Sequence, residues 1–382
     1  MILFLHNRYR TPGGEERVVE DLAWLVREHL GEDAEVLERD SARLGRGRAA
    51  AGLLRGGLDP GEVGDAVRRT GARIVHAHIL HPTLGFRALA AARAAGARTV
   101  LHLHNYRLVC AVGTCVNARG EDCTRCHARD TRPGVRLNCR GNRVEAVTYA
   151  AALAAHQHAM VDAADVVVVP SVAARERLAV LGAPLAAAGA RVLGHVVRRF
   201  TGDDAGAGGA AAPATARAIV TSRLAREKDV DVAIAACARA GMPLTVCGDG
   251  PLAADLRAQA AAVGADVTFA GRVGEAELAR LRAQASVALV PSRAHETFGL
   301  AALEALAAGL PVVAARAGAL ADLDGDVTLV APGDVAAMAG AARAAAADPS
   351  RRALAVQAAR RRAAPAVVAP RLAALYDELA PR

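Results

Sequence analysis

The chain has 382 residues, more than one hydrophobic core ordinarily holds, so two domains are expected. Its formal net charge of +8 favours anionic partners, but aromatic residues make up only 3% of the chain and the arginines alternate with acids, which argues against a nucleic-acid-binding protein. An anionic small molecule, or peripheral contact with an anionic membrane surface, fits this charge better.

Short apolar runs alternate with longer Ala-, Leu- and Arg-rich segments at helical spacing, which predicts parallel strands separated by helices. The predicted strands are residues 1–5, 73–75, 99–102 and 166–169, then 218–221, 244–247, 267–270, 287–290, 312–314 and 328–330. The first run is too short for a signal peptide, and no stretch approaches the length of a membrane span, so a cytoplasmic protein is expected.

This alternation predicts an α/β fold of two doubly wound parallel-sheet domains, with ligands at the carboxyl ends of the strands in a cleft between them. Residues 201–209 are small, polar and rich in glycine, which indicates a linker or surface loop. We therefore expect domains at 1–197 and 198–365. A helix at 366–382 follows, with the N-terminal domain as its candidate docking partner.

A cysteine-rich loop interrupts the first half of the chain. Four of its cysteines are arranged symmetrically: Cys110, Cys123, Cys126 and Cys139. Two flanking cysteines around a Cys-x2-Cys pair are compatible with structural zinc, although Cys115 in the same loop is an additional candidate ligand. Free thiols and disulfides remain the alternatives, and a cytoplasmic location disfavours disulfides.

The chain contains a single lysine, Lys228, although Lys and Arg together number 47. Lys228 lies with Arg223 just after the predicted strand at 218–221. The compact ammonium of lysine is not equivalent to the guanidinium of arginine, so a cation pair at a strand exit suggests a phosphate clamp. The alternative is an ordinary surface lysine.

A second pattern follows the predicted strand at 287–290. Glu296 precedes a helix expected to begin near Phe298 and end at Gly309, and Glu304 lies within it. Gly299 would let a ligand approach the first turn, where free backbone N–H groups bind anions. Two carboxylates on either side of an anion site could accept hydrogen bonds from the hydroxyls of an extended ligand. The alternative is that Glu304 is a solvated helix residue and that Glu296 interacts with the helix dipole.

Glu296 and Glu304, with Phe298-Gly299-Leu300 between them, resemble the signature of the retaining glycosyltransferases of family 4, which have the GT-B fold. Further segments resemble successive loops of that family in the same order: residues 9–16, 75–78, 103–107, 164–171, 223–228, 247–251 and 269–273. The family usually has glycine after the lysine, where this chain has Asp229, which puts the conformation of that loop in question.

The resemblance implies a donor site for a nucleoside diphosphate sugar in the C-terminal domain. Arg223 and Lys228 would neutralise the leaving diphosphate, which replaces a catalytic metal ion. Glu296 would hold the transferred sugar and Glu304 the ribose. The remaining donor-binding candidates are Gly14 for approach to the phosphates, Phe298, Gly299 and Leu300 at the helix start, and Arg272 and Val273 at the nucleobase.

The resemblance places His104 beside the anomeric carbon and assigns no nucleophile. Acceptor-side candidates are Glu15, His78, Asn105 and Arg107, although His78 is equally compatible with a structural role in the core. No cofactor is expected for the chemistry.

We therefore expect transfer of a sugar from a UDP-sugar, or secondarily a GDP-sugar, to the hydroxyl of a saccharide, glycolipid or secondary metabolite. A nucleotide-sugar 2-epimerase of the same fold and a non-catalytic nucleotide-sugar-binding protein are the alternatives.

Overall fold

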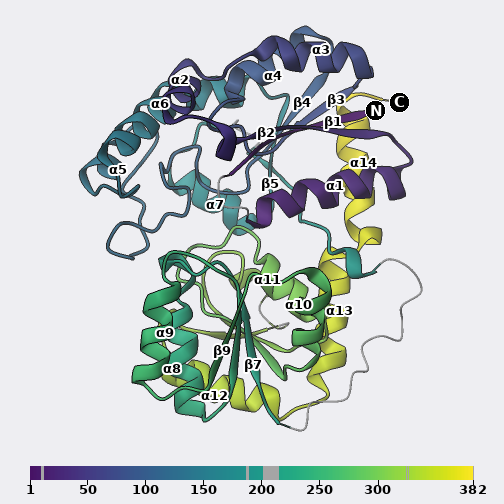
Figure 1. Ribbon diagram of the computed structural model, residues 1–382. Helices are drawn as coiled ribbons and strands as arrows, with labels where there is room; N and C mark the ends of the chain where they lie inside the picture. Colours follow the sequence, from purple (N-terminus) through teal and green to yellow (C-terminus); the bar gives the residue numbers. More distant parts are fainter. Residues whose placement is uncertain (10–12, 186–188, 201–214, 324, 326, 382) are drawn as a thin grey trace. The chain divides into compact units, whose positions relative to one another are not determined.

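The chain divides into two compact units, shown in the computed structural model of Figure 1. One unit comprises Met1–Val196 with Pro365–Arg382, and the other comprises Val197–Ala364. The structure describes residues 1–382 except 10–12, 186–188, 201–214, 324, 326 and 382. The linker expected at 201–209 lies outside the described residues.

The first unit contains a six-stranded parallel sheet in the order β2-β1-β3-β4-β5-β6. Its strands are β1 (Ile2–Arg8), β2 (Ala34–Asp40), β3 (Ile74–Ala77), β4 (Arg98–His102), β5 (Val166–Val169) and β6 (Arg191–Val192). Because β1 pairs with both β2 and β3, the strand order reverses beside β1. Ligands of such sheets bind outside the carboxyl ends of the strands at this reversal.

Helices cover both faces of this sheet (Figure 1). The C-terminal helix packs against α1 on one face, while α4 packs against α3 and α6 on the other. The helices are α1 (Gly14–Leu30), α2 (Arg46–Arg55), α3 (Pro60–Thr70), α4 (Gly85–Ala94), α5 (Arg132–Arg136), α6 (Arg143–Asp162), α7 (Val172–Val180) and α14 (Pro365–Leu379), with a 3-10 turn η1 (Ser41–Arg43).

The second unit repeats this design with a parallel sheet in the order β12-β11-β10-β7-β8-β9. Its strands are β7 (Ala218–Thr221), β8 (Leu244–Cys247), β9 (Val267–Gly271), β10 (Val287–Val290), β11 (Val312–Ala315) and β12 (Thr328–Val330). Here the order reverses beside β7, which pairs with β8 on one side and β10 on the other.

The helices of the second unit form two layers, in which α8 packs against α9 and α12, and α11 packs against α13. The helices are α8 (Val230–Ala240), α9 (Ala253–Ala262), α10 (Glu275–Ala283), α11 (Leu300–Ala307), α12 (Val335–Ala346) and α13 (Arg351–Ala363), with 3-10 turns η2 (Arg198–Phe200), η3 (Arg226–Lys228) and η4 (Ala321–Leu323). The two sheets with helices on both faces confirm the expected α/β class, two doubly wound domains.

The expected strands are all present, because each is an apolar run buried in a parallel sheet covered on both faces. Two further strands, β2 and β6, lie at the edges of the first sheet and were not predicted. β2 is only partly buried and carries Glu35, Glu38 and Arg39, so its sequence lacks the apolar signal of the central strands.

Candidate functional site

In the second unit, the predicted site residues gather where the strand order reverses. Lys228 lies in the segment that follows β7, and Glu296 lies in the segment that follows the neighbouring strand β10. The carboxyl ends of parallel neighbours share one edge of the sheet, so the fold brings these two segments together.

Lys228 and Glu296 form an ion pair in which Nζ lies 2.5 Å from Oε1. The Ser292 hydroxyl donates to the same carboxylate oxygen at 2.6 Å. Burial opposes ionisation of Glu296, but Lys228 and Ser292 together hold its pKa below the ordinary value. Glu296 is therefore a carboxylate at neutral pH, and it is already paired with the only lysine of the chain.

Arg223 reaches the same region through the turn that carries Lys228. Its guanidinium pairs with the carboxylate of Glu227. The carbonyl oxygen of Glu227 accepts hydrogen bonds from the backbone N–H groups of Arg293 and Ala294, each at 3.1 Å. Backbone contacts thus tie the turn with both cations to the segment that carries Glu296.

Asp229 adopts the backbone conformation that the usual glycine would favour. Its φ of 46° is in the left-handed region, where a side chain is disfavoured. The Asp229 carboxylate is buried and accepts a hydrogen bond from Arg293 Nε at 2.8 Å. The departure from the family pattern therefore preserves the turn and adds an ion pair to the β10 segment.

The helix after Glu296 begins two residues later than expected, at Leu300, and ends at Ala307. Gly299 precedes it with a φ of 81°, and an added Cβ would lie 2.8 Å from Leu320 Cδ2. The left-handed Gly299 follows the bend at Thr297 and Phe298 and precedes the first turn of α11. That turn presents the start of a helix, the end at which anions are stabilised.

Glu304 lies inside α11 and is paired with Arg282 of α10, whose guanidinium donates to Oε2 at 2.8 Å. Both side chains are 11% exposed. The solvated helix position considered from the sequence is therefore wrong, because Glu304 is largely buried with a cationic partner.

Arg272 and Val273 follow β9, two strands away from β7. Arg272 is exposed, whereas Val273 is partly buried and packs on the cluster that contains Leu303 of α11. The Gly248 N–H donates to the Gly271 carbonyl at 2.7 Å, which holds this segment beside the end of β8.

In the first unit, three of the acceptor-side candidates meet around the phenol of Tyr9. Arg107 and Asn105 both donate to the Tyr9 hydroxyl, and Asn105 Nδ2 also lies 3.4 Å from Glu15 Oε1. Burial raises the pKa of Tyr9 to about 12 despite the nearby Arg107, so the phenol stays neutral. These residues come from the ends of β1 and β4 and from α1.

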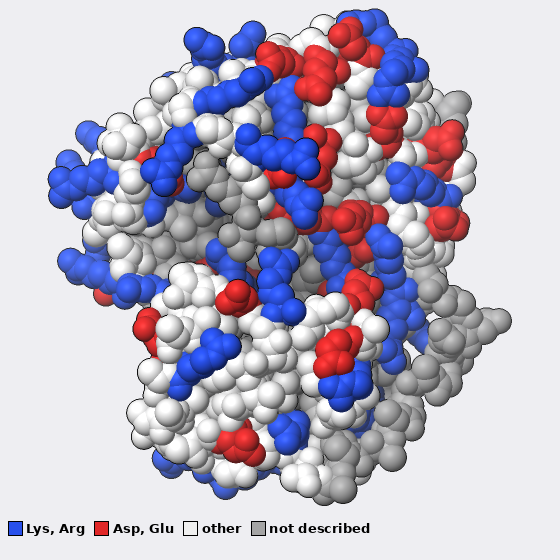
Figure 2. All heavy atoms as spheres, in the orientation of Figure 1, with Lys and Arg blue, Asp and Glu red and all other residues white. Residues whose placement is uncertain are grey.

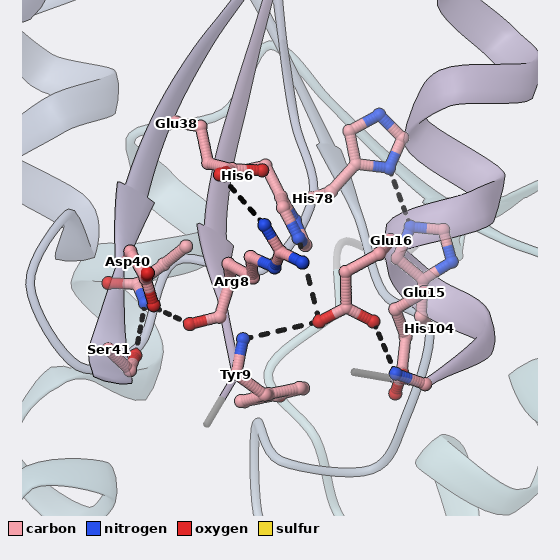
Figure 3. A network of polar contacts seen from close by, with 12 residues as sticks. His6, Arg8, Tyr9, Glu15, Glu16, Glu38, Asp40, Ser41, His78 and His104 are labelled. Carbon is pink, nitrogen blue, oxygen red and sulfur yellow. Dashed lines mark hydrogen bonds and ion pairs between the residues drawn. The ribbon is translucent and has the colours of Figure 1, made fainter. Parts of the chain in front are cut away.

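Gly14 is the first residue of α1, and the side chain of Glu16 turns back toward Tyr9 (Figure 3). The Glu16 carboxylate accepts hydrogen bonds from the N–H groups of Tyr9 at 3.2 Å and Gly13 at 2.6 Å. The chain therefore enters α1 with these backbone groups held in place.

His104 and His78 contact each other through Nε2 and Nδ1 at 2.6 Å (Figure 3). Both rings are buried, at 6% and 3% exposure. Burial lowers the pKa of each histidine well below its ordinary value, and neighbouring histidines add to the effect. Both imidazoles are therefore neutral at neutral pH, and His78 is a core residue that supports His104.

The five cysteines of the loop line one small cavity: Cys110, Cys115, Cys123, Cys126 and Cys139. All are free thiols. In the part of the chain that the structure describes, the close groups of three or more metal-ligating side chains consist of histidines, and no cysteine belongs to one. Structural zinc on Cys110, Cys123, Cys126 and Cys139 is therefore not supported, and neither are disulfides.

Basic and acidic side chains are interspersed on the face shown in Figure 2.

Among the described helices, none is both long and apolar enough to cross a membrane.

Several residues of the site were not singled out from the sequence. Ser292 and Arg293 carry no pattern of their own, and they contribute only because β10 lies beside β7. Arg282 is one of many helical arginines, so its pairing with Glu304 has no sequence signal. Tyr9 and Glu16 belong to a segment singled out for its glycines, and their contacts depend on the ends of β1 and α1.

Residues 215–348 match the family model described as Glycosyl transferases group 1. Over 107 residues, 26% of this chain, the sequence is 44% identical to the GDP-mannose-dependent alpha-(1-6)-phosphatidylinositol dimannoside mannosyltransferase of Mycobacterium tuberculosis. Over 114 residues, 28% of this chain, it is 41% identical to the 2-deoxystreptamine glucosyltransferase of Streptomyces kanamyceticus. These matches span 27% and 29% of the lengths of the two relatives.

The structure of Anabaena HepE in complex with UDP is similar over 99% of this chain and 100% of that protein, with a TM-score of 0.63 and 20% sequence identity. At that identity the similarity shows the fold, which is GT-B. The family match covers residues 215–348 of the second unit, whereas the similarity of fold extends over both units.

Proposed function

We propose that this protein is a retaining hexosyltransferase that moves a sugar from a nucleoside diphosphate sugar to an acceptor hydroxyl without a catalytic metal ion. The observation that carries the proposal is the ion pair of Lys228 with Glu296 at the reversal of the second sheet. The pair supports the proposal because an ammonium and a carboxylate lie together at the edge where such sheets bind ligands.

Lys228 and Arg223 are assigned to the donor diphosphate. As the bond to the sugar breaks, negative charge develops on the leaving diphosphate, and fixed cations stabilise that charge. Gly299 and Leu300 open α11 beside Glu296, so backbone N–H groups of the first turn are assigned to the same phosphates. Gly14 at the start of α1 is assigned an equivalent role in the first unit.

Glu296 is assigned to the hydroxyls of the transferred sugar and Glu304 to those of the ribose. A carboxylate accepts hydrogen bonds from two neighbouring hydroxyls, and both residues are ionised or ion-paired. Arg282 keeps Glu304 in position from α10. Phe298, Arg272 and Val273 complete the assigned donor site, the last two beside the nucleobase.

His104 is assigned to the sugar near the anomeric carbon, as a neutral ring held by His78. Glu15, Asn105 and Arg107 are assigned to the acceptor, since they form one polar group around Tyr9. We propose a UDP-sugar as the donor, with a GDP-sugar as the alternative. A UDP complex of a protein with this fold supports the first, and a GDP-mannose-dependent relative supports the second.

The test is an assay of the purified protein with UDP- and GDP-sugars, with and without a panel of saccharide and glycolipid acceptors. Transfer that persists in EDTA and keeps the anomeric configuration of the donor, read by NMR, supports the proposal. Epimerisation of the donor without acceptor, or donor binding without any turnover, contradicts it.

Glu296→Gln should lower kcat by about 100-fold or more while the donor still binds, because the neutral amide no longer accepts from two hydroxyls. Glu277→Gln is the matched control, since Glu277 is an exposed residue of α10 paired only within its own helix with Arg280. Equal kcat values for the two variants would remove Glu296 from the site.

A further inference from the structure

The first unit contains a cluster of buried histidines on one side of its central strands. Strands β1, β3 and β4 are parallel, with Phe4 opposite His76 and His76 opposite Val100. Alternate residues of neighbouring strands therefore share a face, which brings His76 and His78 of the β3 segment beside His102 of β4. The rings of His76 and His78 stack with centroids 4.5 Å apart, and those of His76 and His102 with centroids 5.4 Å apart.

The three rings are close enough to share one ligand. One nitrogen from each of His76, His78 and His102 lies within 4.8 Å of the corresponding nitrogens of the other two. His76 Nε2 and His102 Nδ1 are 3.2 Å apart. Two imidazole nitrogens bound to one tetrahedral zinc ion lie about 3.4 Å apart, so this separation needs little adjustment.

The cluster also has polar atoms that the protein itself does not satisfy. Nε2 of His78 and Nε2 of His102 are buried, and neither has a hydrogen-bond partner among the described residues. Buried polar atoms in proteins are normally paired, so the unpaired Nε2 of His78 indicates that the cluster accommodates a further group. In His102 the nitrogen beside His76 is Nδ1, and Nε2 is the other nitrogen of the ring.

The other side of His76 is already fixed. Its Nδ1 lies 2.6 Å from the hydroxyl of Tyr376, a buried residue of α14. A hydrogen bond to one ring nitrogen sets the orientation of the imidazole and directs its other nitrogen, here Nε2, toward the ligand. This arrangement is typical of the outer partners of metal-binding histidines.

We propose that His76, His78 and His102 bind a divalent transition-metal ion, with Zn²⁺ as the expected ion. Imidazole is a ligand for zinc, copper, nickel and iron, whereas Mg²⁺ and Ca²⁺ require oxygen ligands, which these three residues do not supply. The bound ion links β3 to β4 and, through His76 and Tyr376, links both strands to α14. Its role is to stabilise the first unit, including the position of His104, which contacts His78.

The experiment uses the full chain, stripped with a chelator and titrated with Zn²⁺ at neutral pH. The proposal predicts one equivalent of saturable binding and a melting midpoint that rises with free Zn²⁺. His102→Gln should abolish both effects, while the exposed His29→Gln should leave them unchanged. These readouts do not involve a nucleotide sugar, so their failure and a failure of the proposed transferase activity are distinguishable.

His102 also belongs to a second close group with His104 and His195, and His76→Gln, which leaves that group intact, should abolish binding only if the ion lies at His76, His78 and His102. The cysteine cavity is a further competing site, and Co²⁺ separates it from the histidines without any substitution. Cobalt bound by thiolates shows a sulfur-to-metal charge-transfer band in the near ultraviolet, whereas cobalt bound by imidazoles shows only weak d–d bands. The proposal predicts binding without the charge-transfer band, and binding that survives alkylation of the cysteines. No saturable binding, or binding lost on alkylation, overturns it, even if His102→Gln fails to fold.

Discussion

Lys228 and Glu296 are separated by 68 residues in the sequence and meet through one ion pair. The pair holds an ammonium and a carboxylate in defined positions, and each can exchange its partner for groups of a ligand. In the proposed reaction, diphosphate oxygens take the place of the carboxylate at Lys228, and sugar hydroxyls donate to Glu296. The ion pair thereby preorganises both groups.

The coupling between these two residues predicts a pH effect. Lys228 lowers the pKa of Glu296, whereas burial raises it. In Lys228→Ala burial remains, opposed by the Ser292 hydrogen bond and by nearby His295, so the pKa of Glu296 should rise and the carboxylate should take up its proton at a higher pH. The acid limb of the kcat/KM profile should therefore move to higher pH in Lys228→Ala and stay in place in Arg226→Ala. An unmoved limb would show that the two side chains do not interact.

Cys110 is predicted to be the most reactive thiol of the cysteine loop. A hydrogen bond from the Cys115 thiol lowers the pKa of Cys110 to about 6, while the same contact and burial raise that of Cys115. Alkylation of Cys110 by iodoacetamide, followed by peptide mass spectrometry, should rise with pH around a midpoint near 6. Cys115→Ser keeps a hydrogen-bond donor and should retain the low midpoint, whereas Cys115→Ala should raise it.

At the scale of elements, the start of α11 depends on the backbone of Gly299. Gly299→Ala should lower the free energy of unfolding by about 1–2 kcal/mol, because a residue with a Cβ is strained in the left-handed region. The added methyl group would also press on Leu320. Gly274→Ala is the control, since Gly274 caps α10 with an ordinary φ of −72° and has nothing within 4 Å of an added Cβ. Urea denaturation of both variants measures the difference, and equal losses would contradict the strain.

The elements of the fold were predictable where burial leaves a strong pattern. β7 and β10 are short apolar runs whose burial on both faces makes them visible in the sequence. The edge strands β2 and β6 lack this pattern. Helix α11 begins two residues later than predicted, because the chain bends at Thr297 and Phe298 and Gly299 is left-handed. Helical periodicity alone does not reveal this backbone conformation.

The site was predictable only in part, for a similar reason. Glu296 and Lys228 stood out from a motif and from the scarcity of lysine. Their direct contact required the pairing of β7 with β10, which no local pattern encodes. The pairing of Glu304 with Arg282 likewise depends on how α10 packs beside α11.

On the scale of the whole molecule, the chain comprises two units with separate hydrophobic cores. One core lies in the first unit, and two clusters on opposite faces of β7–β12 lie in the second. The residues assigned to the donor belong to the second unit apart from Gly14 and His104, and the histidine cluster belongs to the first. The two proposals meet at His78, which contacts His104, so the metal site is tested by readouts that need no nucleotide sugar.

The central claim is that Lys228, held by Glu296 at the reversal of the second sheet, binds the donor diphosphate. Calorimetric titration of UDP and GDP into the wild-type protein, Lys228→Ala and Arg226→Ala tests it most directly. For the preferred nucleotide, we expect Lys228→Ala to weaken binding roughly 10- to 100-fold, as for loss of a charge-assisted hydrogen bond worth about 1.5–3 kcal/mol. Arg226→Ala should bind like the wild type. Unchanged affinity in Lys228→Ala would contradict the claim.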